Sequence, residues 1–236
     1  MRLLVRNSML RTTALIAGVV LLIGASTANA FSLRSPQVVF NYTPLQNYLN
    51  SVGESINVAT DQLDAQVWQS SVSGNTTFTL MFELTGNIYS NAIGVYNAND
   101  VSPALNQVFP GAATAGWFAT CHFTSTGTLL VYLYDDTGTF QGLTSYSGVD
   151  RTHFGFYVQS PLGLWYSQDA RNPANNAQIL TYAGTGQNYG DWWECFESFN
   201  KNLVTPTYTG AVVLLQSVAP TPTANKSWGQ LKATYR

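Results

Sequence analysis

Hydrophobic and polar residues alternate along much of the chain after Ile56, which is the pattern of β-strands with one buried face. Over 78–84, phenylalanine and leucine occupy every second position. Turn sequences rich in glycine, aspartate and threonine separate the alternating segments. The pattern predicts strands over 78–84, 91–96, 117–123, 128–134, 153–158, 163–166, 192–197 and 209–218. Short strands at this spacing predict an all-β fold, a two-sheet antiparallel β-sandwich of jelly-roll-like type.

Two of these segments predict where each side chain points. In 117–123, Trp117, Ala119, Cys121 and Phe123 share one face, opposite Phe118, Thr120 and His122. The segment 128–134 is apolar on both faces, with leucines, valine and tyrosines at odd and even positions alike. A strand of that kind is expected at the centre of a sheet that is covered on both sides.

In one segment near the N-terminus the hydrophobic residues repeat with the period of a helix. Leu45, Tyr48, Leu49 and Val52 share a single helical face. Thr43 is the expected cap, Pro44 suits the first turn, and Gly53 suits the end. We expect this short N-terminal helix to pack on a sheet.

The first thirty residues have the parts of a secretory signal peptide. Three arginines precede an apolar run from Ala14 to Gly24, and Ala28-Asn29-Ala30 forms a cleavage site. The apolar run is too short for a membrane span, so no transmembrane segment is expected in the mature chain. The predicted organisation is a cleaved signal peptide over 1–30, a β-sandwich over 31–218, and a Pro/Thr linker with a basic, aromatic tail over 219–236. The tail is either a disordered terminus or a sorting or docking signal.

The amino-acid composition limits the classes of molecule that the protein is expected to bind. Charged residues make up 9% of the chain, against about 25% in an average soluble domain, so Asn, Gln, Ser and Thr must supply the polar surface. Without 1–30 the chain keeps seven basic and twelve acidic residues. An acidic chain has no field to attract phosphate backbones, so nucleic acid is not an expected partner. The expected localisation is secreted, extracellular or at the cell surface.

Export changes the interpretation of the only two cysteines, Cys121 and Cys195. In an oxidising compartment a single pair of cysteines predicts one disulfide. The alternative is two buried, unpaired thiols that pack as small core residues. Neither cysteine has the neighbouring Cys or His of a zinc site, so no metal is expected.

No motif for catalysis is present. Asp135 and Asp136 begin a turn with too few carboxylates for a calcium loop, which predicts a solvated turn. Glu194 and Glu197 are three positions apart on a strand, so they point to opposite faces and cannot form a glycosidase pair by themselves. A hydrolase using Asp191 or Glu197 is the least favoured hypothesis. No cofactor is expected.

Aromatic residues supply the candidate binding site. Trp165, Tyr166 and Trp192 lie near polar Asn- and Gln-containing loops and could stack on sugar rings. The alternative is that they are core residues, because Trp and Tyr bury large areas.

Seven segments occur in a characteristic order between Thr43 and Val218. They are Leu45-Gln-Asn-Tyr-Leu-Asn-Ser-Val52, Ile56-Asn-Val-Ala-Thr-Asp-Gln62, Asn91-Ala-Ile-Gly-Val-Tyr96, Val108-Phe-Pro-Gly-Ala112, His153-Phe-Gly-Phe-Tyr157, Leu164-Trp-Tyr-Ser167 and Trp193-Glu-Cys-Phe-Glu197. Their order resembles a bacterial extracellular family, domain of unknown function 4114. The resemblance implies a secreted β-sandwich module of surface and matrix proteins with no established enzymatic role. Relatives carry an acidic loop that looks like a calcium site, but Ser198 and Thr209 stand here where acids are expected, so no metal site is carried over.

The leading hypothesis is therefore a non-catalytic cell-surface or extracellular-matrix protein, not an enzyme. The alternative is a carbohydrate-binding, lectin-like module. The expected partners are polysaccharide or components of the cell envelope.

Overall fold

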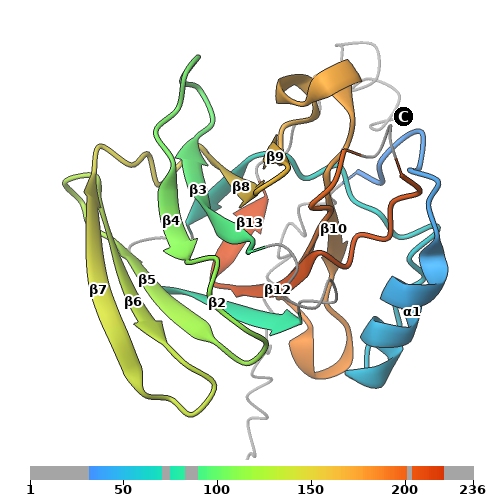
Figure 1. Ribbon diagram of the computed structural model, residues 1–236, viewed down its shortest axis with the longest axis horizontal. Helices are drawn as coiled ribbons and strands as arrows, with labels where there is room; N and C mark the ends of the chain where they lie inside the picture. Colours follow the sequence, from blue (N-terminus) through green and yellow to red (C-terminus); the bar gives the residue numbers. More distant parts are fainter. Residues whose placement is uncertain (1–31, 71–74, 83–89, 201–203, 221–236) are drawn as a thin grey trace, which may run out of the picture. The chain divides into compact units, whose positions relative to one another are not determined.

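The strands form two sheets in which every described pairing is antiparallel (Figure 1). The computed structural model describes residues 32–70, 75–82, 90–200 and 204–220, and for 75–82 it describes the backbone. One sheet has the order β13 (Val218–Pro220), β1 (Trp68–Ser70), β8 (Phe154–Ser160), β3 (Ala92–Asn97) and β4 (Asn106–Phe109), and β9 (Gly163–Tyr166) also pairs with β8. The other has the order β10 (Ile179–Ala183), β11 (Trp192–Phe196), β12 (Ala211–Gln216), β2 (Asn75–Phe82), β5 (Phe118–Phe123), β6 (Thr128–Tyr134) and β7 (Phe140–Ser147). The predicted all-β sandwich is confirmed.

The main core lies between the two sheets. The six-stranded sheet contributes residues such as Trp68, Phe156 and Val158, and the seven-stranded sheet contributes Val131 and Val213. On β5 the inward residues are Ala119, Cys121 and Phe123, all buried, as the alternating pattern predicts. The period of two along the strands therefore sorts side chains into this core.

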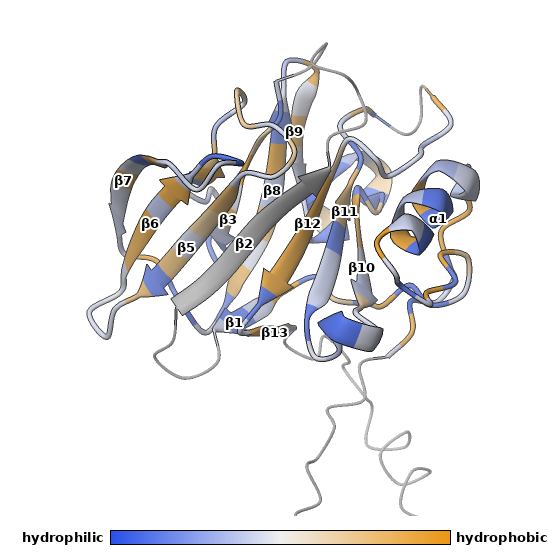
Figure 2. Ribbon diagram, turned by 90° about the horizontal axis from the view of Figure 1, so that it is seen from below, coloured by the Kyte–Doolittle hydropathy of each residue, from blue (hydrophilic) through white to orange (hydrophobic). Residues whose placement is uncertain are grey.

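A second apolar layer lies on the outer face of β10, β11 and β12, where helix α1 (Tyr42–Ser51) packs (Figure 2). Leu45 and Leu49 of α1 are fully buried there, which confirms the predicted helix and its packing on a sheet. The predicted end at Gly53 is also confirmed, since its φ of 86° is a conformation that favours glycine. The predicted cap is wrong: Thr43 lies inside the helix and Asn41 occupies the cap position, without a side-chain hydrogen bond.

Strand β12 is covered on both sides, whereas the prediction that β6 is covered in this way is wrong. Ala211–Leu215 are all buried because the main core covers one face of β12 and the α1 layer covers the other. On β6 only Leu129 and Val131 are buried, and the outward residues are half-buried. Helix α1 reaches only the β10–β12 side of the sheet, so no described helix or strand covers the second apolar face of β6 (Figures 1 and 2).

The predicted disulfide between Cys121 and Cys195 is also wrong: both cysteines are free and buried. Cys121 on β5 points into the main core, whereas Cys195 on β11 points into the α1 layer. Strands β12 and β2 separate them within the sheet, so at about 4.8 Å per strand the two cysteines lie about 14 Å apart. A disulfide needs Cα atoms within about 7 Å. The alternative of two buried thiols holds, and burial raises the pKa of both.

The sandwich continues past the boundary predicted at residue 218. Val218–Pro220 forms β13 and pairs with β1, with Trp68 opposite Pro220, so the predicted linker begins inside a strand. The predicted signal peptide over 1–30 and the tail beyond Pro220 lie outside the described residues. Within the described ranges, no helix combines the length and apolar character needed to cross a bilayer.

Candidate functional site

The structure does not bring the three predicted sugar-stacking residues onto one surface. Trp165 is 6% exposed in the main core, and its Nε1–H donates to the Ser198 carbonyl at 3.2 Å. Trp192 packs against the same core, and its Nε1–H donates to the Val218 carbonyl at 3.0 Å. Tyr166 lies on the opposite side of β9, with its ring edge-on to Tyr96 at 4.9 Å between centroids. The two tryptophans therefore have the core role that was the alternative in the sequence.

The acidic residues near Trp192 occupy three separate environments. Asp191 accepts a hydrogen bond from Gln216 Nε2 at 3.0 Å. Glu197 is 2% exposed and accepts the backbone N–H groups of Phe199, Thr207 and Tyr208, so it holds the loop before β12 together. Glu194 is fully buried on β11 between Trp192 and Phe196, which belong to the main core, whereas Glu197 lies beyond the end of that strand. These contacts describe structural roles for all three carboxyl groups.

Glu194 is a fully buried carboxyl group whose Oε1 accepts a hydrogen bond from Thr181 Oγ1. Burial raises its pKa well above the ordinary value, and the Thr181 hydrogen bond and the Arg34 guanidinium offset only part of that effect. The folded protein therefore holds Glu194 in its neutral form at pH values where the unfolded chain is ionised. The stability that this group contributes is complete below the unfolded pKa of about 4.3 and is lost as the pH rises through the folded pKa.

We expect Glu194→Gln to raise the stability of the protein at neutral pH, because glutamine reproduces the neutral carboxyl group and does not ionise on unfolding. The gain is about 1.4 kcal/mol for each unit by which the folded pKa exceeds the unfolded one. Thermal unfolding of both proteins between pH 4 and pH 8 measures it, and the two curves should converge at the acid end (~pH 4). A variant that is less stable at neutral pH, or a difference that does not change with pH, would show that Glu194 is ionised in the fold.

The Asp135–Asp136 turn is solvated, as predicted. Asp135 accepts hydrogen bonds from the Thr137 backbone and hydroxyl and from Gln141 Nε2. The Thr137 hydroxyl is the main reason that the pKa of Asp135 lies below its ordinary value. The turn therefore uses its own donors to hold the carboxylate. Across the described residues, no group of three or more His, Cys, Asp or Glu is placed to hold a metal ion.

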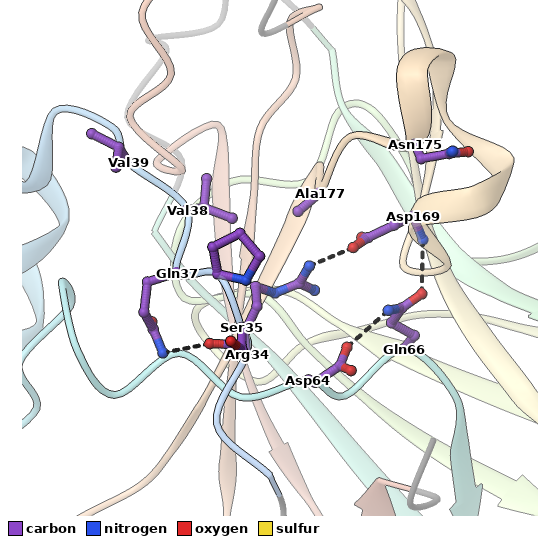
Figure 3. A pocket seen from close by; sticks show the side chains of 11 residues that line it. Arg34, Ser35, Gln37, Val38, Val39, Asp64, Gln66, Asp169, Asn175 and Ala177 are labelled. Atoms are coloured by element: carbon purple, nitrogen blue, oxygen red, sulfur yellow. Dashed lines mark hydrogen bonds and ion pairs between the residues drawn. The ribbon is translucent and has the colours of Figure 1, made fainter. Parts of the chain in front are cut away.

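A polar cavity of about 450 Å³ lies beside Arg34 (Figure 3). The Arg34 guanidinium forms an ion pair with Asp169 of the short helix η1 (Asp169–Arg171). Gln66 Nε2 donates to Asp64 Oδ1 at 2.8 Å, and Gln66 Oε1 accepts the Asp169 backbone N–H at 2.9 Å. The polar groups of the cavity thus bind one another, and they tie the chain before α1 to η1. We interpret this cavity as a structural junction.

The open face of β5, β6 and β7 has a different character. Its outward positions carry a continuous set of aromatic and aliphatic side chains, here called the aromatic face: Phe118, Leu130, Tyr132, Tyr134, Phe140 and Leu143. The Phe118 and Tyr134 rings stack at 4.9 Å between centroids with their planes 9° apart, and Tyr134 contacts Phe140 at 5.6 Å. Phe140 is 53% exposed and Leu143 is 51% exposed. Because neighbouring apolar side chains of this kind often belong to interaction surfaces, the aromatic face is the candidate binding surface.

Sequence reasoning missed the aromatic face although a signal for it was present. The outward residues Leu130, Tyr132 and Tyr134 make 128–134 apolar on both sides, and a covering layer was the expected explanation. The structure places Thr120 and His122 of β5 and Ser145 of β7 around the rings on the same face. The face therefore combines ring surfaces with hydroxyl and imidazole groups.

No family model, curated protein or solved structure matches the chain. The fold and its surfaces are the observations from which a function can be inferred.

Proposed function

We propose that the protein is a non-catalytic, exported polysaccharide-binding protein that holds glycan chains on its aromatic face. The observation that supports this proposal is the set of rings on β5, β6 and β7, which no described element covers. The exported location and the surface or matrix role predicted from the sequence belong to the same proposal.

The chemistry of the aromatic face suits sugars. A pyranose ring presents an apolar C–H surface with hydroxyl groups around its rim, and aromatic rings pack against such surfaces while polar groups at their margin take the hydroxyls. Tyr132 and Tyr134 supply both a ring and a hydroxyl group. Thr120, His122 and Ser145 lie in the same rows of outward side chains. None of the described outward residues of β5, β6 and β7 carries a carboxylate or ammonium group, so the aromatic face favours a neutral polymer over a charged partner.

The rings are also held before a ligand arrives. Phe118 stacks on Tyr134, and Tyr134 contacts Phe140, so each ring restricts its neighbour. All of them project from paired strands of one sheet. Binding to ordered side chains avoids part of the entropy cost of association. A row of rings along neighbouring strands suits an extended chain or an insoluble polymer better than a single sugar unit.

Other hypotheses are less well supported. Trp165 is buried in the core, so stacking on it would require the core to open, and Trp192 is half-buried with its indole N–H bound to the Val218 carbonyl. A hydrolase using Asp191 or Glu197 would need carboxylates that face a common ligand, and these two are engaged by separate partners. The resemblance to domain of unknown function 4114 and docking through the tail stay predictions.

We expect the purified protein to sediment with insoluble polysaccharides and to release no reducing ends from them. The variant Tyr132→Ala/Tyr134→Ala should bind about tenfold to a hundredfold more weakly, because each lost ring removes about 0.5–1.5 kcal/mol of stacking besides its buried area. Co-sedimentation with a panel of bacterial and plant polysaccharides, with reducing ends measured in the same tubes, tests both statements.

Tyr189→Ala is the matched control, because Tyr189 is 87% exposed and lies in the turn before β11, outside the aromatic face. It should bind like the wild type. Thermal unfolding of each variant separates loss of binding from loss of fold. Failure of the wild type to sediment with any polymer, or full retention by the double variant, would refute the proposal. Release of reducing ends would instead favour a hydrolase.

A further inference from the structure

Strand β7 is the exposed edge of the seven-stranded sheet. It runs from Phe140 to Ser147 and pairs with β6 on one side, and the described residues place no strand on its other side (Figure 1). Most of its residues are exposed. The Tyr146 hydroxyl donates to the Gln107 carbonyl at 3.0 Å, which anchors the strand to β4 of the opposite sheet. The edge therefore offers ordered backbone N–H and C=O groups to another strand.

The other sheet edges in the described chain are covered or short. At β10, the Leu63 N–H donates to the Thr181 carbonyl at 2.9 Å, so the preceding loop covers that edge. Strands β4 and β9 have four residues each and β13 has three. Short edge strands offer few hydrogen bonds to a second chain. With eight residues, β7 is the long open edge.

Strand β7 also lacks the residues that usually prevent pairing between edges. No Lys, Arg, Asp, Glu or Pro occurs between Thr137 and Val149. Proteins commonly place lysine or proline on an exposed edge strand to block such pairing. One bulge opposite Leu133 and Tyr134 interrupts the ladder near Gln141, so the regular part of the edge is 142–147.

We propose that two copies of the protein pair through β7, antiparallel and about a twofold axis, to join their seven-stranded sheets. Strand edges are complemented by strands, and a twofold interface uses the same patch on both copies. A second copy fits because an uncharged edge neither repels itself nor attracts an oppositely charged partner. The outward residues Leu143 and Ser145 stay on the outer face only if each pairs with an odd-numbered outward residue of the other copy. The two aromatic faces then form one continuous surface.

Single cysteine substitutions on β7 test where the twofold axis of the proposed dimer crosses the strand. Native Cys121 and Cys195 are buried, so they do not compete for cross-linking. Single variants Leu143→Cys, Thr144→Cys and Ser145→Cys each place a thiol where it meets its own copy in one register of the pairing. Mild oxidation followed by non-reducing electrophoresis should give a covalent dimer with one of them. The control Tyr189→Cys, exposed but outside β7, should give only background cross-linking.

Sedimentation velocity of the purified protein tests the assembly itself, without any glycan. The wild type should be dimeric and the Thr144→Lys variant monomeric, because the lysines of the two copies repel each other across the axis. The Thr144 side chain is exposed, so the substitution should leave the fold of each copy unchanged. Thermal unfolding of the wild type and of Thr144→Lys is compared at a protein concentration low enough for both to be monomeric. Equal midpoints show that the variant keeps the fold. A monomeric wild type refutes the proposal. A dimer that Thr144→Lys does not disturb, or that no β7 cysteine traps, places the interface elsewhere and refutes it too.

Discussion

Replacing Trp68 by alanine is expected to lower the free energy of unfolding by about 4 kcal/mol, because it opens a large cavity between the sheets. Trp68 is fully buried on β1. Its ring lies edge-on to Phe156 at 5.4 Å and to Trp192 at 6.0 Å between centroids, so it contacts both sheets of the sandwich. Urea unfolding followed by tryptophan fluorescence and circular dichroism measures the loss.

The matched variant is Trp68→Phe. The indole Nε1 of Trp68 is buried and has no hydrogen-bond partner among the described residues, and such a donor costs about 1–3 kcal/mol. Phenylalanine removes that donor and keeps most of the ring contacts, so it should cost much less than alanine. Equal losses for the two variants would show that the indole N–H contributes to the fold and that ring packing does not dominate.

Glu54→Ala is expected to cost about 3 kcal/mol, because it leaves the buried Trp193 indole and the partly buried donors of Thr185 and Asn188 without their acceptor. Glu54 follows the end of α1 and is 4% exposed. Its Oε1 accepts Trp193 Nε1–H at 2.8 Å and Asn188 Nδ2–H at 2.7 Å. Its Oε2 accepts both the backbone N–H and the hydroxyl of Thr185 at 2.6 Å. One carboxylate therefore ties the helix end to the turn before β11 and to the second core layer.

The same contacts give Glu54 a pH signature. Burial alone would raise its pKa, but the hydrogen bonds from Thr185, Asn188 and Trp193 outweigh it, so the pKa lies below the ordinary value. The stabilisation is present above the unfolded pKa of about 4.3 and is lost as the pH falls through the lower folded pKa. Glu54→Gln does not titrate, so its deficit relative to the wild type should shrink in acid. A deficit that stays constant with pH would contradict a charged Glu54.

The outer face of the seven-stranded sheet has two halves with different surroundings, one over β10–β12 and one over β5–β7. On the β10–β12 half, α1 and Glu54 close the face over Trp193 and Cys195. On the β5–β7 half, no element of the described residues covers the rings. The proposed glycan surface and the proposed pairing edge both belong to the uncovered half.

Local sequence was sufficient to predict a structural feature wherever that feature depends on a single helix or strand. The spacing of Leu45 and Leu49 predicted α1 and its buried face, and the alternation around Cys121 predicted the inward side of β5. Both follow from the helical and strand periods alone. Strand β7 was missed because its exposed, polar positions carry no alternation, and β13 was missed because Pro220 suggested a linker. Pairing with a neighbouring strand, which local sequence does not encode, makes each of them a strand.

The sequence by itself determined the β-sandwich class, the one α-helix of the described chain and the buried faces of α1 and β5, because these depend on periodicity within single elements. Only the tertiary structure decided the order of strands and the area that α1 covers. That order puts two strands between Cys121 and Cys195 and turns them to opposite faces, so no disulfide forms. It also places Trp165 in the core and leaves Tyr132 and Tyr134 on an open face. The apolar residues of a strand indicate that the strand packs against another apolar surface. Which surface that is depends on contacts between residues distant in sequence.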